Sequence, residues 1–443
     1  MKRQIISSAL ALSLVLGGAA ALPEGVFSES LISVKADDAV KKIALGNTIT
    51  DIIPDGSANS YQFTTTQDGY VQIEFIKGDI EGYEKGWSVD VYDSKDTKLM
   101  GTWIVGDTPK DLAALGLPKG TYKVEVGRCY AWDRMGSQYK MTVNFKASSK
   151  WEKEANEDIT QATTAALDST YGGALSYGSK SEQDFFKYSI PSSGYYRLFF
   201  GKDFDSAERG WEVTFYDSYG QSLESTNIYA GTTKTETYDI KLNKGTAYIR
   251  VTSLGYEDFP RATYKLRLIK TIPLSGGKLK LNKTSAAYTG KTIKPTTTVK
   301  VGGTTLKKGT DYRVTFTNCK NIGKATVTVT GIGKYRGTLT KTFKIVPKKT
   351  TIKKVTSPKT KQLKVTYKKN ANATGYQITY STSKKFTKKT TKNTTVKSAT
   401  TLNKTIKKLK KGKTYYVKVR AYKTVGSTKY YGAYSAVKKV KVK

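Results

Sequence analysis

The sequence predicts an all-β protein, in which four tandem antiparallel β-sandwich modules follow a signal peptide. Three observations predict this fold class. Tyr supplies 31 of the 443 residues, often beside Val, Ile and Thr, which are residue types favoured in strands. Apolar and polar residues alternate over short runs that are separated by glycine-containing turns. One set of these runs also occurs twice, about 125 residues apart.

Residues 1–36 are expected to be a secretory signal peptide. Two basic residues near the start precede an apolar run over residues 5–22, which is the pattern of such peptides. The run is short and interrupted for a transmembrane helix, which needs about 20 apolar residues. We expect cleavage after Ala36, with a site near Ala21 as the alternative. The mature chain is predicted to be secreted, extracellular and without a transmembrane segment.

An internal repeat divides the next part of the chain into two copies of one module, at residues 37–148 and 149–270. Four pairs of segments match in the same order and at nearly the same offset, as two copies of one domain require. The matches are residues 69–70 with 194–195, 86–94 with 210–218, 117–121 with 242–246, and 139–141 with 264–266.

The basic residues are concentrated after residue 270. Residues 271–346 hold 15 Lys and Arg and one acid, Asp311, whereas residues 347–443 hold 29 Lys and Arg and no acid. The whole chain carries a formal charge of +39, so residues 1–270 carry a net −4. This shift predicts a third module at 271–347 and a fourth at 348–443.

The basic modules are predicted to be folded rather than to form charged tails. Leu363, Val365 and Tyr367 alternate with Lys364 and Lys368. This alternation is typical of a half-buried strand with Lys on its solvent-exposed face. Lys along strand edges also blocks aggregation, which explains part of the excess without a partner.

The composition excludes several catalytic chemistries. The chain has no His, so it can form no Ser-His-Asp triad, no Cys-His pair and no His-ligated zinc site. Every long segment is accounted for as a small sandwich, so no enzyme domain and no catalytic residue are expected. Cys129 and Cys319 lie in different predicted modules and are expected to remain unpaired.

The paired repeat resembles the pre-peptidase C-terminal domains of bacteria, which are β-sandwiches of secreted enzymes and surface proteins. The resemblance rests on residues 151–158 (WEKEANED) and 184–188 (DFFKY) of the second copy. We call residues 151–158 the acidic lead-in. The first copy has no corresponding acidic segment, so its assignment rests on the internal repeat. None of the families that this chain resembles brings a catalytic centre.

The two basic modules resemble other extracellular families. Residues 271–347 resemble an immunoglobulin-like repeat of Gram-positive surface proteins, in the runs 309–312 (GTDY) and 331–338 (GIGKYRGT). Residues 348–443 are similar to fibronectin type III modules, in which a Tyr hydroxyl ties a corner to the backbone. Here Leu409 lies six residues before Tyr415, as that signature requires.

Calcium is the one metal that the sequence suggests, beside the main expectation of no cofactor. Carboxylate and amide oxygens are the hard ligands that calcium prefers, and some members of the pre-peptidase family bind calcium near this lead-in. Solvated acids on a loop explain the same residues equally well. The candidate ligands are Glu154, Asn156, Glu157, Asp158 and Asp184.

Trp132 is the one residue singled out for ligand binding. It lies between predicted strands in the run 129–134 (CYAWDR). An aromatic residue on a loop can stack on a sugar ring or enter a protein interface. A loop Trp that closes the end of a sandwich core is the alternative.

The charge of the basic half predicts a polyanionic partner. Many positive charges without counter-charges repel one another, and a polyanion relieves that repulsion. Outside a Gram-positive cell the abundant anionic polymers are teichoic acids of the wall and membrane. Export argues against nucleic acid as the partner in vivo. A Lys-rich surface that serves only solubility is the alternative.

Together these features predict a secreted, non-enzymatic, cell-surface-associated binding, adhesion or scaffold protein. Anionic wall polymers would hold its basic half, while residues 37–270 contact a glycan or an extracellular protein. The alternative function is a freely secreted carbohydrate-binding or enzyme-accessory module.

Overall fold

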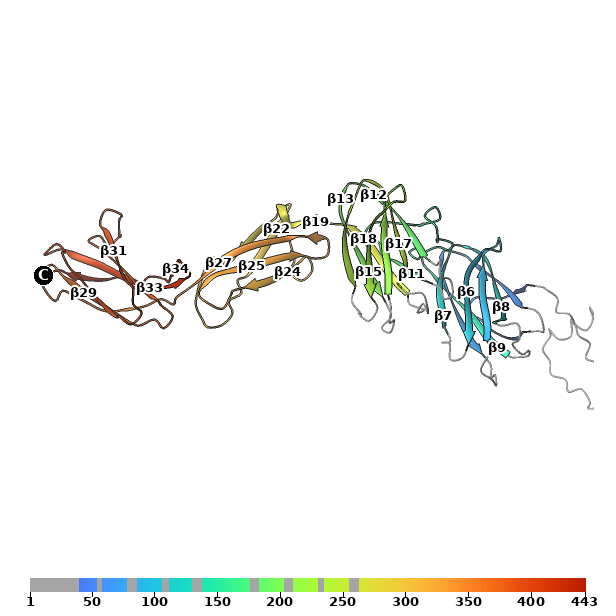
Figure 1. Cartoon of the computed structure of the whole chain (residues 1–443), viewed down its shortest axis with the longest axis horizontal. Helices are drawn as coiled ribbons and strands as arrows, with labels where there is room; N and C mark the ends of the chain where they lie inside the picture. Colours follow the sequence, from blue (N-terminus) through green and yellow to red (C-terminus); the bar gives the residue numbers. More distant parts are fainter. Residues whose placement is uncertain are drawn as a thin grey trace, which may run out of the picture. The chain divides into compact units, whose positions relative to one another are not determined.

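The computed structural model describes residues 40–53, 58–77, 86–105, 111–129, 138–175, 183–202, 210–229, 235–254 and 263–443 (Figure 1). The predicted signal peptide lies outside these residues. The described residues form strands and one short 3₁₀ turn, η1 (Leu274–Gly276), so the all-β prediction is confirmed. Within this part of the chain, no helix is long and apolar enough to cross a membrane.

The described residues fall into two compact units. One lies within residues 1–64, 73–111 and 120–144, and the other lies within 65–72, 112–119 and 145–443. Two short segments of the first repeat therefore belong to the same unit as the second repeat. The predicted module boundaries stay predictions.

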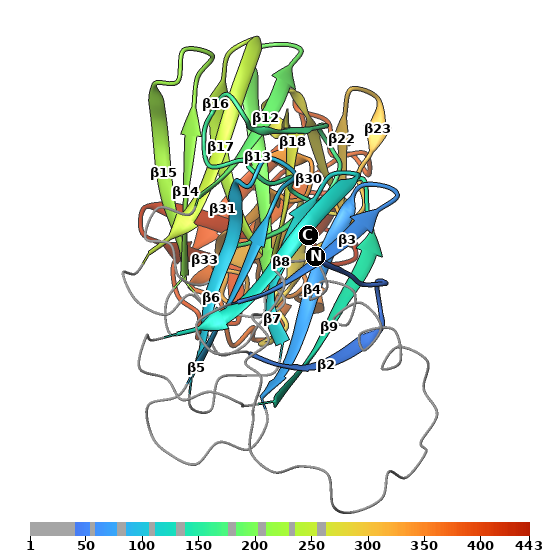
Figure 2. The ribbon, with the colours of Figure 1, turned by 90° about the vertical axis from the view of Figure 1, so that its right-hand side faces the viewer.

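The first repeat is a sandwich of two sheets with strand orders β1-β3-β8-β5-β6 and β2-β9-β4-β7 (Figure 2). Its strands are β1 (Lys41–Lys42), β2 (Thr48–Ile52), β3 (Asn59–Thr65), β4 (Gly69–Lys77), β5 (Gly86–Tyr92), β6 (Lys98–Val105), β7 (Asp111–Leu117), β8 (Gly120–Arg128) and β9 (Gln138–Ala147).

The second repeat has the same topology, with sheets β10-β12-β17-β14-β15 and β11-β18-β13-β16. Each strand of the first repeat has its counterpart, from β1 and β10 to β9 and β18, so the sequence repeat specifies one fold twice. Its strands are β10 (Thr163–Ala165), β11 (Tyr171–Ala174), β12 (Gln183–Ile190), β13 (Gly194–Lys202), β14 (Gly210–Tyr216), β15 (Ser222–Tyr229), β16 (Glu236–Leu242), β17 (Gly245–Ser253) and β18 (Thr263–Lys270).

The pairing is not wholly antiparallel. In both repeats a short edge strand runs parallel to its neighbour, β1 beside β3 and β10 beside β12. The intervening strand, β2 or β11, belongs to the opposite sheet. The chain therefore crosses to that sheet and returns in its original direction, which makes the pair parallel.

The third module has sheets β20-β22-β23 and β21-β27-β25-β24, with the short pair β19-β26. Its strands are β19 (Ile272–Pro273), β20 (Lys278–Leu281), β21 (Ser285–Ala287), β22 (Thr297–Val301), β23 (Thr304–Thr305), β24 (Tyr312–Thr317), β25 (Gly323–Gly331), β26 (Tyr335–Arg336) and β27 (Thr338–Val346).

The fourth module has sheets β28-β29-β32 and β31-β30-β33-β34, with β35 also paired to β33. Its strands are β28 (Ile352–Thr356), β29 (Leu363–Tyr367), β30 (Gly375–Ser381), β31 (Thr391–Val396), β32 (Asn403–Ile406), β33 (Thr414–Val425), β34 (Thr428–Tyr431) and β35 (Lys438–Lys441).

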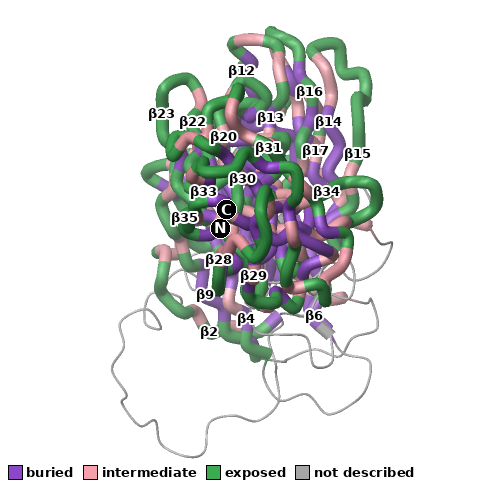
Figure 3. The backbone as a smooth tube through the Cα atoms, turned by 90° about the vertical axis from the view of Figure 1, so that its left-hand side faces the viewer, coloured by how far each residue is buried: buried purple, intermediate pink, exposed green. Residues whose placement is uncertain are grey.

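The cores lie between the paired sheets, because buried and more exposed residues alternate along the strands (Figure 3). Trp87 and Trp211 are both buried, as the repeat predicts for inward-facing positions. In the fourth module the Tyr415 hydroxyl accepts a hydrogen bond of 3.2 Å from the Lys410 backbone N–H, which is the expected corner tie.

Candidate metal centre

The segment that follows the first repeat, residues 151–158, is held in place by Trp151. This side chain is buried, and its ring stacks on Tyr70 with 4.0 Å between ring centroids. The Glu152 N–H donates to the carbonyl of Gly172 in β11 at 2.9 Å, and the Glu154 N–H donates to the carbonyl of Gly116 in β7 at 2.9 Å. All of these residues belong to one compact unit, so the backbone of the segment is held on two sides.

Three carboxylates meet here, two from this segment and one from β12 of the second repeat. One oxygen from each of Glu152, Glu154 and Asp184 lies within 4.8 Å of the other two. Glu152 and Asp184 are fully buried, and Glu154 is 9% exposed. The Tyr264 hydroxyl donates to Asp184 Oδ2 and lies 3.1 Å from Glu152 Oε2. The Ala174 N–H donates to Glu152 Oε1 at 2.7 Å.

Two side chains of the cluster have unsatisfied polar atoms. Asn156 is fully buried, and among the described residues neither of its amide atoms has a hydrogen-bond partner. Its side chain lies close enough to Asp184 to lower the pKa of that carboxyl. Asp184 Oδ1 likewise lacks a partner within the described part of the chain. A buried polar atom left unpaired costs about 1–3 kcal/mol, so these atoms are suited to pair with a bound group.

Like-charged groups also lie close together in the cluster. Burial, with the neighbouring carboxylates of Asp184 and Glu154, raises the pKa of Glu152 well above its usual range. Burial raises the pKa of Asp184 too, although the hydrogen bond from the Tyr264 hydroxyl opposes that rise. No Lys or Arg of the described chain forms an ion pair with Glu152 or Asp184.

These residues fit a bound calcium ion. Calcium takes six to eight hard oxygen ligands, among them carboxylates and amide carbonyls. Glu152, Glu154, Asp184 and the amide oxygen of Asn156 would supply them, with water completing the set. A divalent cation would neutralise the buried carboxylates and use the unpaired oxygens.

The first repeat carries a different set of groups at the same place. Asp51 of β2 pairs with Tyr139 of β9. The Asp51 carboxylate accepts hydrogen bonds from the Tyr61 hydroxyl at 2.7 Å and from Lys41 Nζ at 2.6 Å. Burial raises the pKa of Asp51, but these hydrogen bonds outweigh burial and bring the pKa below its usual value. The ammonium of Lys41 is thus a built-in counter-charge.

A glycine makes room for Glu152 in the second repeat. Gly173 pairs with Tyr264, as Asp51 pairs with Tyr139 in the first repeat. A Cβ atom placed on Gly173 would lie less than 3.0 Å from both the Tyr264 hydroxyl and Glu152 Oε2. The Glu152 carboxylate therefore occupies space that a side chain of β11 would otherwise fill.

Two further exchanges separate the repeats. Thr163 of β10 takes the register position that Lys41 has in β1. Asn59 stands where the second repeat has Asp184, at the same offset as the other sequence matches. The first repeat therefore combines one carboxylate, one amide and one ammonium, whereas the second brings three carboxylates together and has Thr163 at the register position of Lys41. A bound cation would supply in the second repeat the positive charge that Lys41 supplies in the first.

The structure brings together three of the five predicted calcium ligands, Glu154, Asn156 and Asp184. The other two lie outside the three-carboxylate cluster. Asp158 is exposed, and its Oδ1 accepts a hydrogen bond from the Thr160 N–H at 2.7 Å. Glu157 is half-buried, and its proximity raises the pKa of Asp184.

The sequence analysis missed Glu152 as a ligand. The signal was present in the alternation of Glu152, Glu154 and Asn156 within the lead-in, since each of these is buried and the residues between them are half-buried. Trp132 lies outside the described residues, so its proposed role stays a prediction. Within the described part of the chain, neither Cys129 nor Cys319 forms a disulfide.

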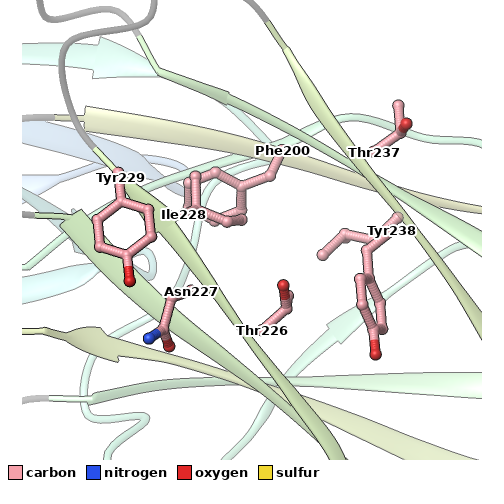
Figure 4. Close-up of a pocket in the computed structure, with 8 residues that line it drawn as sticks. Phe200, Thr226, Asn227, Ile228, Tyr229, Thr237 and Tyr238 are labelled. Carbon is pink, nitrogen blue, oxygen red and sulfur yellow. The ribbon is translucent and has the colours of Figure 1, made fainter.

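A hollow of about 260 Å³ opens on the side of the second repeat, between β15 and β16 (Figure 4). Phe200 and Ile228 form its apolar floor, and Tyr229 and Tyr238 flank it. Among the residues that the structure describes, no charged one lines the hollow, and its volume is below the ~300–1,000 Å³ typical of ligand sites. It therefore offers a shallow apolar contact rather than a specific site.

No family model matches the chain, and no curated protein matches it. Among solved structures, it is similar to the pre-peptidase C-terminal domain of a collagenase from Bacillus anthracis. The identity is 16%, the match covers 24% of this chain and 97% of that one, and the TM-score is 0.20. It is also similar to the FN1–FN3 domains of chicken CNTN1, with 11% identity, coverage of 86% and 97%, and a TM-score of 0.20. At these values neither likeness carries an argument about this chain.

Proposed function

We propose that the chain is a secreted, non-enzymatic binding or scaffold protein of the cell surface, held there by anionic wall polymers through residues 271–443. One observation carries this proposal. Residues 347–443 form a folded module with 29 Lys and Arg and no Asp or Glu.

The placement of these charges supports a polymer partner. Lys364 is exposed between the buried Leu363 and Val365 of β29, and Lys438 and Lys439 are exposed on β35. Folding therefore keeps the Lys side chains in solvent, where they repel one another. A polyphosphate chain releases counterions when it binds such a surface, and Lys suits loose phosphate contact better than specific readout.

Calcium has a structural role in this proposal. Bound by Glu152, Glu154, Asn156 and Asp184, it would fix the segment that follows the first repeat. Lys153 lies within this segment, and its ammonium pairs with Asp68 at 2.6 Å. The nearly neutral repeats would then present a stiffened surface to a glycan or an extracellular protein.

Co-sedimentation of the full chain with purified Gram-positive walls tests the proposal. We expect binding to intact walls and loss of most binding after the teichoic acids are extracted. Equal binding to extracted walls would contradict the anchor and favour the freely secreted glycan-binding module. If the protein stays in the supernatant with both intact and extracted walls, the wall anchor is contradicted, and the excess of Lys is explained by solubility alone.

A further inference from the structure

Sheet β31-β30-β33-β34 of the fourth module carries interleaved cations and aromatic rings on its outer face. Lys418 Nζ lies 4.1 Å from the ring centroid of Phe386 and 4.4 Å from that of Tyr434. Arg420 Cζ lies 4.1 Å from the centroid of Tyr431 and 4.4 Å from that of Tyr434. We call these five residues the cation–aromatic ladder.

The ladder holds its two cations close together. Lys418 and Arg420 alternate with the buried Val417, Val419 and Ala421 on β33, so both point to the outer face. Each lies 4.4 Å from the ring centroid of the same tyrosine, which places them within about 9 Å of one another. Two positive groups at this spacing can contact neighbouring charges of one polymer.

Polar contacts fix the orientation of the guanidinium. Arg420 Nε donates to Gln377 Oε1 at 2.8 Å. The Tyr434 hydroxyl donates to the same Oε1 at 3.1 Å and lies 3.0 Å from Thr379 Oγ1. The tyrosine between the two cations is thus anchored at its hydroxyl, and the guanidinium is held at its faces and at one edge. Such preorganisation lowers the entropy cost of binding a ligand.

The remaining donors of Arg420 have no protein acceptor. Among the described residues, none accepts a hydrogen bond from its Nη groups and none forms an ion pair with Arg420 or Lys418. The module itself has no Asp or Glu to fill that place. A guanidinium presents its N–H groups as a planar fork that matches the oxygens of a phosphate.

We propose that the ladder is a binding site for a phosphodiester polymer that lacks bases, of the polyglycerol phosphate kind. Arg420 takes one phosphate through its Nη donors, and Lys418 takes the next charge along the polymer. This inference rests on the proposed function, because it states where on the basic half the wall polymer is held.

The test is binding of the full chain to polyglycerol phosphate at physiological salt, measured by titration calorimetry. Arg420→Lys keeps the charge but removes the fork, and we expect it to weaken binding about tenfold, the loss of one charge-assisted hydrogen bond. Arg313→Lys, at an exposed position of β24 in the third module, is the matched control and should leave affinity unchanged within about twofold.

Thermal unfolding of each variant separates binding from folding. If Arg420→Lys unfolds the module, the affinities of Lys418→Gln and Lys364→Gln for polyglycerol phosphate are compared instead. Each variant lacks one Lys, but only Lys418 lies in the ladder. We expect the loss of binding affinity to be at least fivefold larger for Lys418→Gln than for Lys364→Gln. Equal losses within the pair would overturn the ladder site.

Three further outcomes are distinct. Unchanged binding by a folded Arg420→Lys variant would overturn the ladder while leaving diffuse electrostatic anchoring intact. No binding of the unaltered chain would contradict the proposed function itself. Tighter binding of single-stranded DNA with the same number of phosphates would overturn the assignment to a polymer without bases.

Discussion

Asp184→Asn should raise the unfolding temperature of the calcium-free protein at pH 7.5 and lower that of the calcium-loaded protein. Without a cation, the substitution removes one charge from a fully buried acidic cluster and keeps an oxygen for the Tyr264 hydroxyl. With calcium bound, it removes a charged ligand. We expect about 1–3 kcal/mol in each direction, which corresponds to several degrees.

The dependence on pH follows from the same cluster. Burial raises the pKa of Asp184 from 3.8 to about 7, so between these values the native state binds more protons than the unfolded state. Stability of the calcium-free protein therefore falls as pH rises through this window. Calcium, which binds the deprotonated groups, should reverse the trend. Asp184→Asn should weaken it without abolishing it, because Glu152, whose pKa burial also raises, remains.

Differential scanning calorimetry with chelator or with excess calcium measures both effects. Asp158→Asn is the control, because Asp158 is an exposed acid of the same lead-in outside the cluster. Its effect should be the same in both buffers. If Asp184→Asn destabilises the protein equally with and without calcium, the cluster is a structural hydrogen-bond network and holds no cation.

Gly173→Ala should destabilise the second repeat and abolish its response to calcium. The added Cβ would collide with the Tyr264 hydroxyl and with Glu152 Oε2. Overpacking of this kind costs about 1–3 kcal/mol, and the displaced Glu152 carboxylate would no longer reach the other acids.

The matched control is Gly276→Ala in η1, where a Cβ would meet no atom within 4 Å. Unfolding temperature and calcium affinity, the latter by competition with a chelating dye, should be unchanged in this variant. A Gly173→Ala protein with the full calcium response would show that Glu152 is not a ligand.

Local patterns in the sequence predicted the fold class and much of its detail. The four matched segments anticipated two sandwiches of one topology, in which the matched residues Trp87 and Trp211 are both buried. The spacing of Leu409 and Tyr415 predicted the corner tie. These features depend on residues close in sequence or on a constant offset.

The site was predicted only in part, because its composition depends on long-range pairing. Glu152 enters the cluster because Gly173 faces Tyr264 across the β11-β18 register. The counter-charge of the first repeat depends on the parallel pairing that sets Lys41 beside Tyr61. No local spacing shows either contact.

The ladder of the fourth module was hidden for the same reason. Lys418 and Arg420 alternate with buried residues along β33, so they share the outer face of the sheet. Tyr431 and Tyr434 reach that face only because the chain after β33 folds back along this sheet, with β34 and β35 both paired to β33. The third ring, Phe386, comes from the connection between β30 and β31.

The salt dependence of wall binding by the full chain tests the central claim most directly. If phosphate contacts hold the basic half, the logarithm of the binding constant falls linearly with the logarithm of salt concentration. For six or more contacts, the loss between 50 and 200 mM salt should be about a thousandfold or greater, judged by the behaviour of DNA-binding proteins. A binding constant that does not change over this range would contradict electrostatic anchoring by the basic modules.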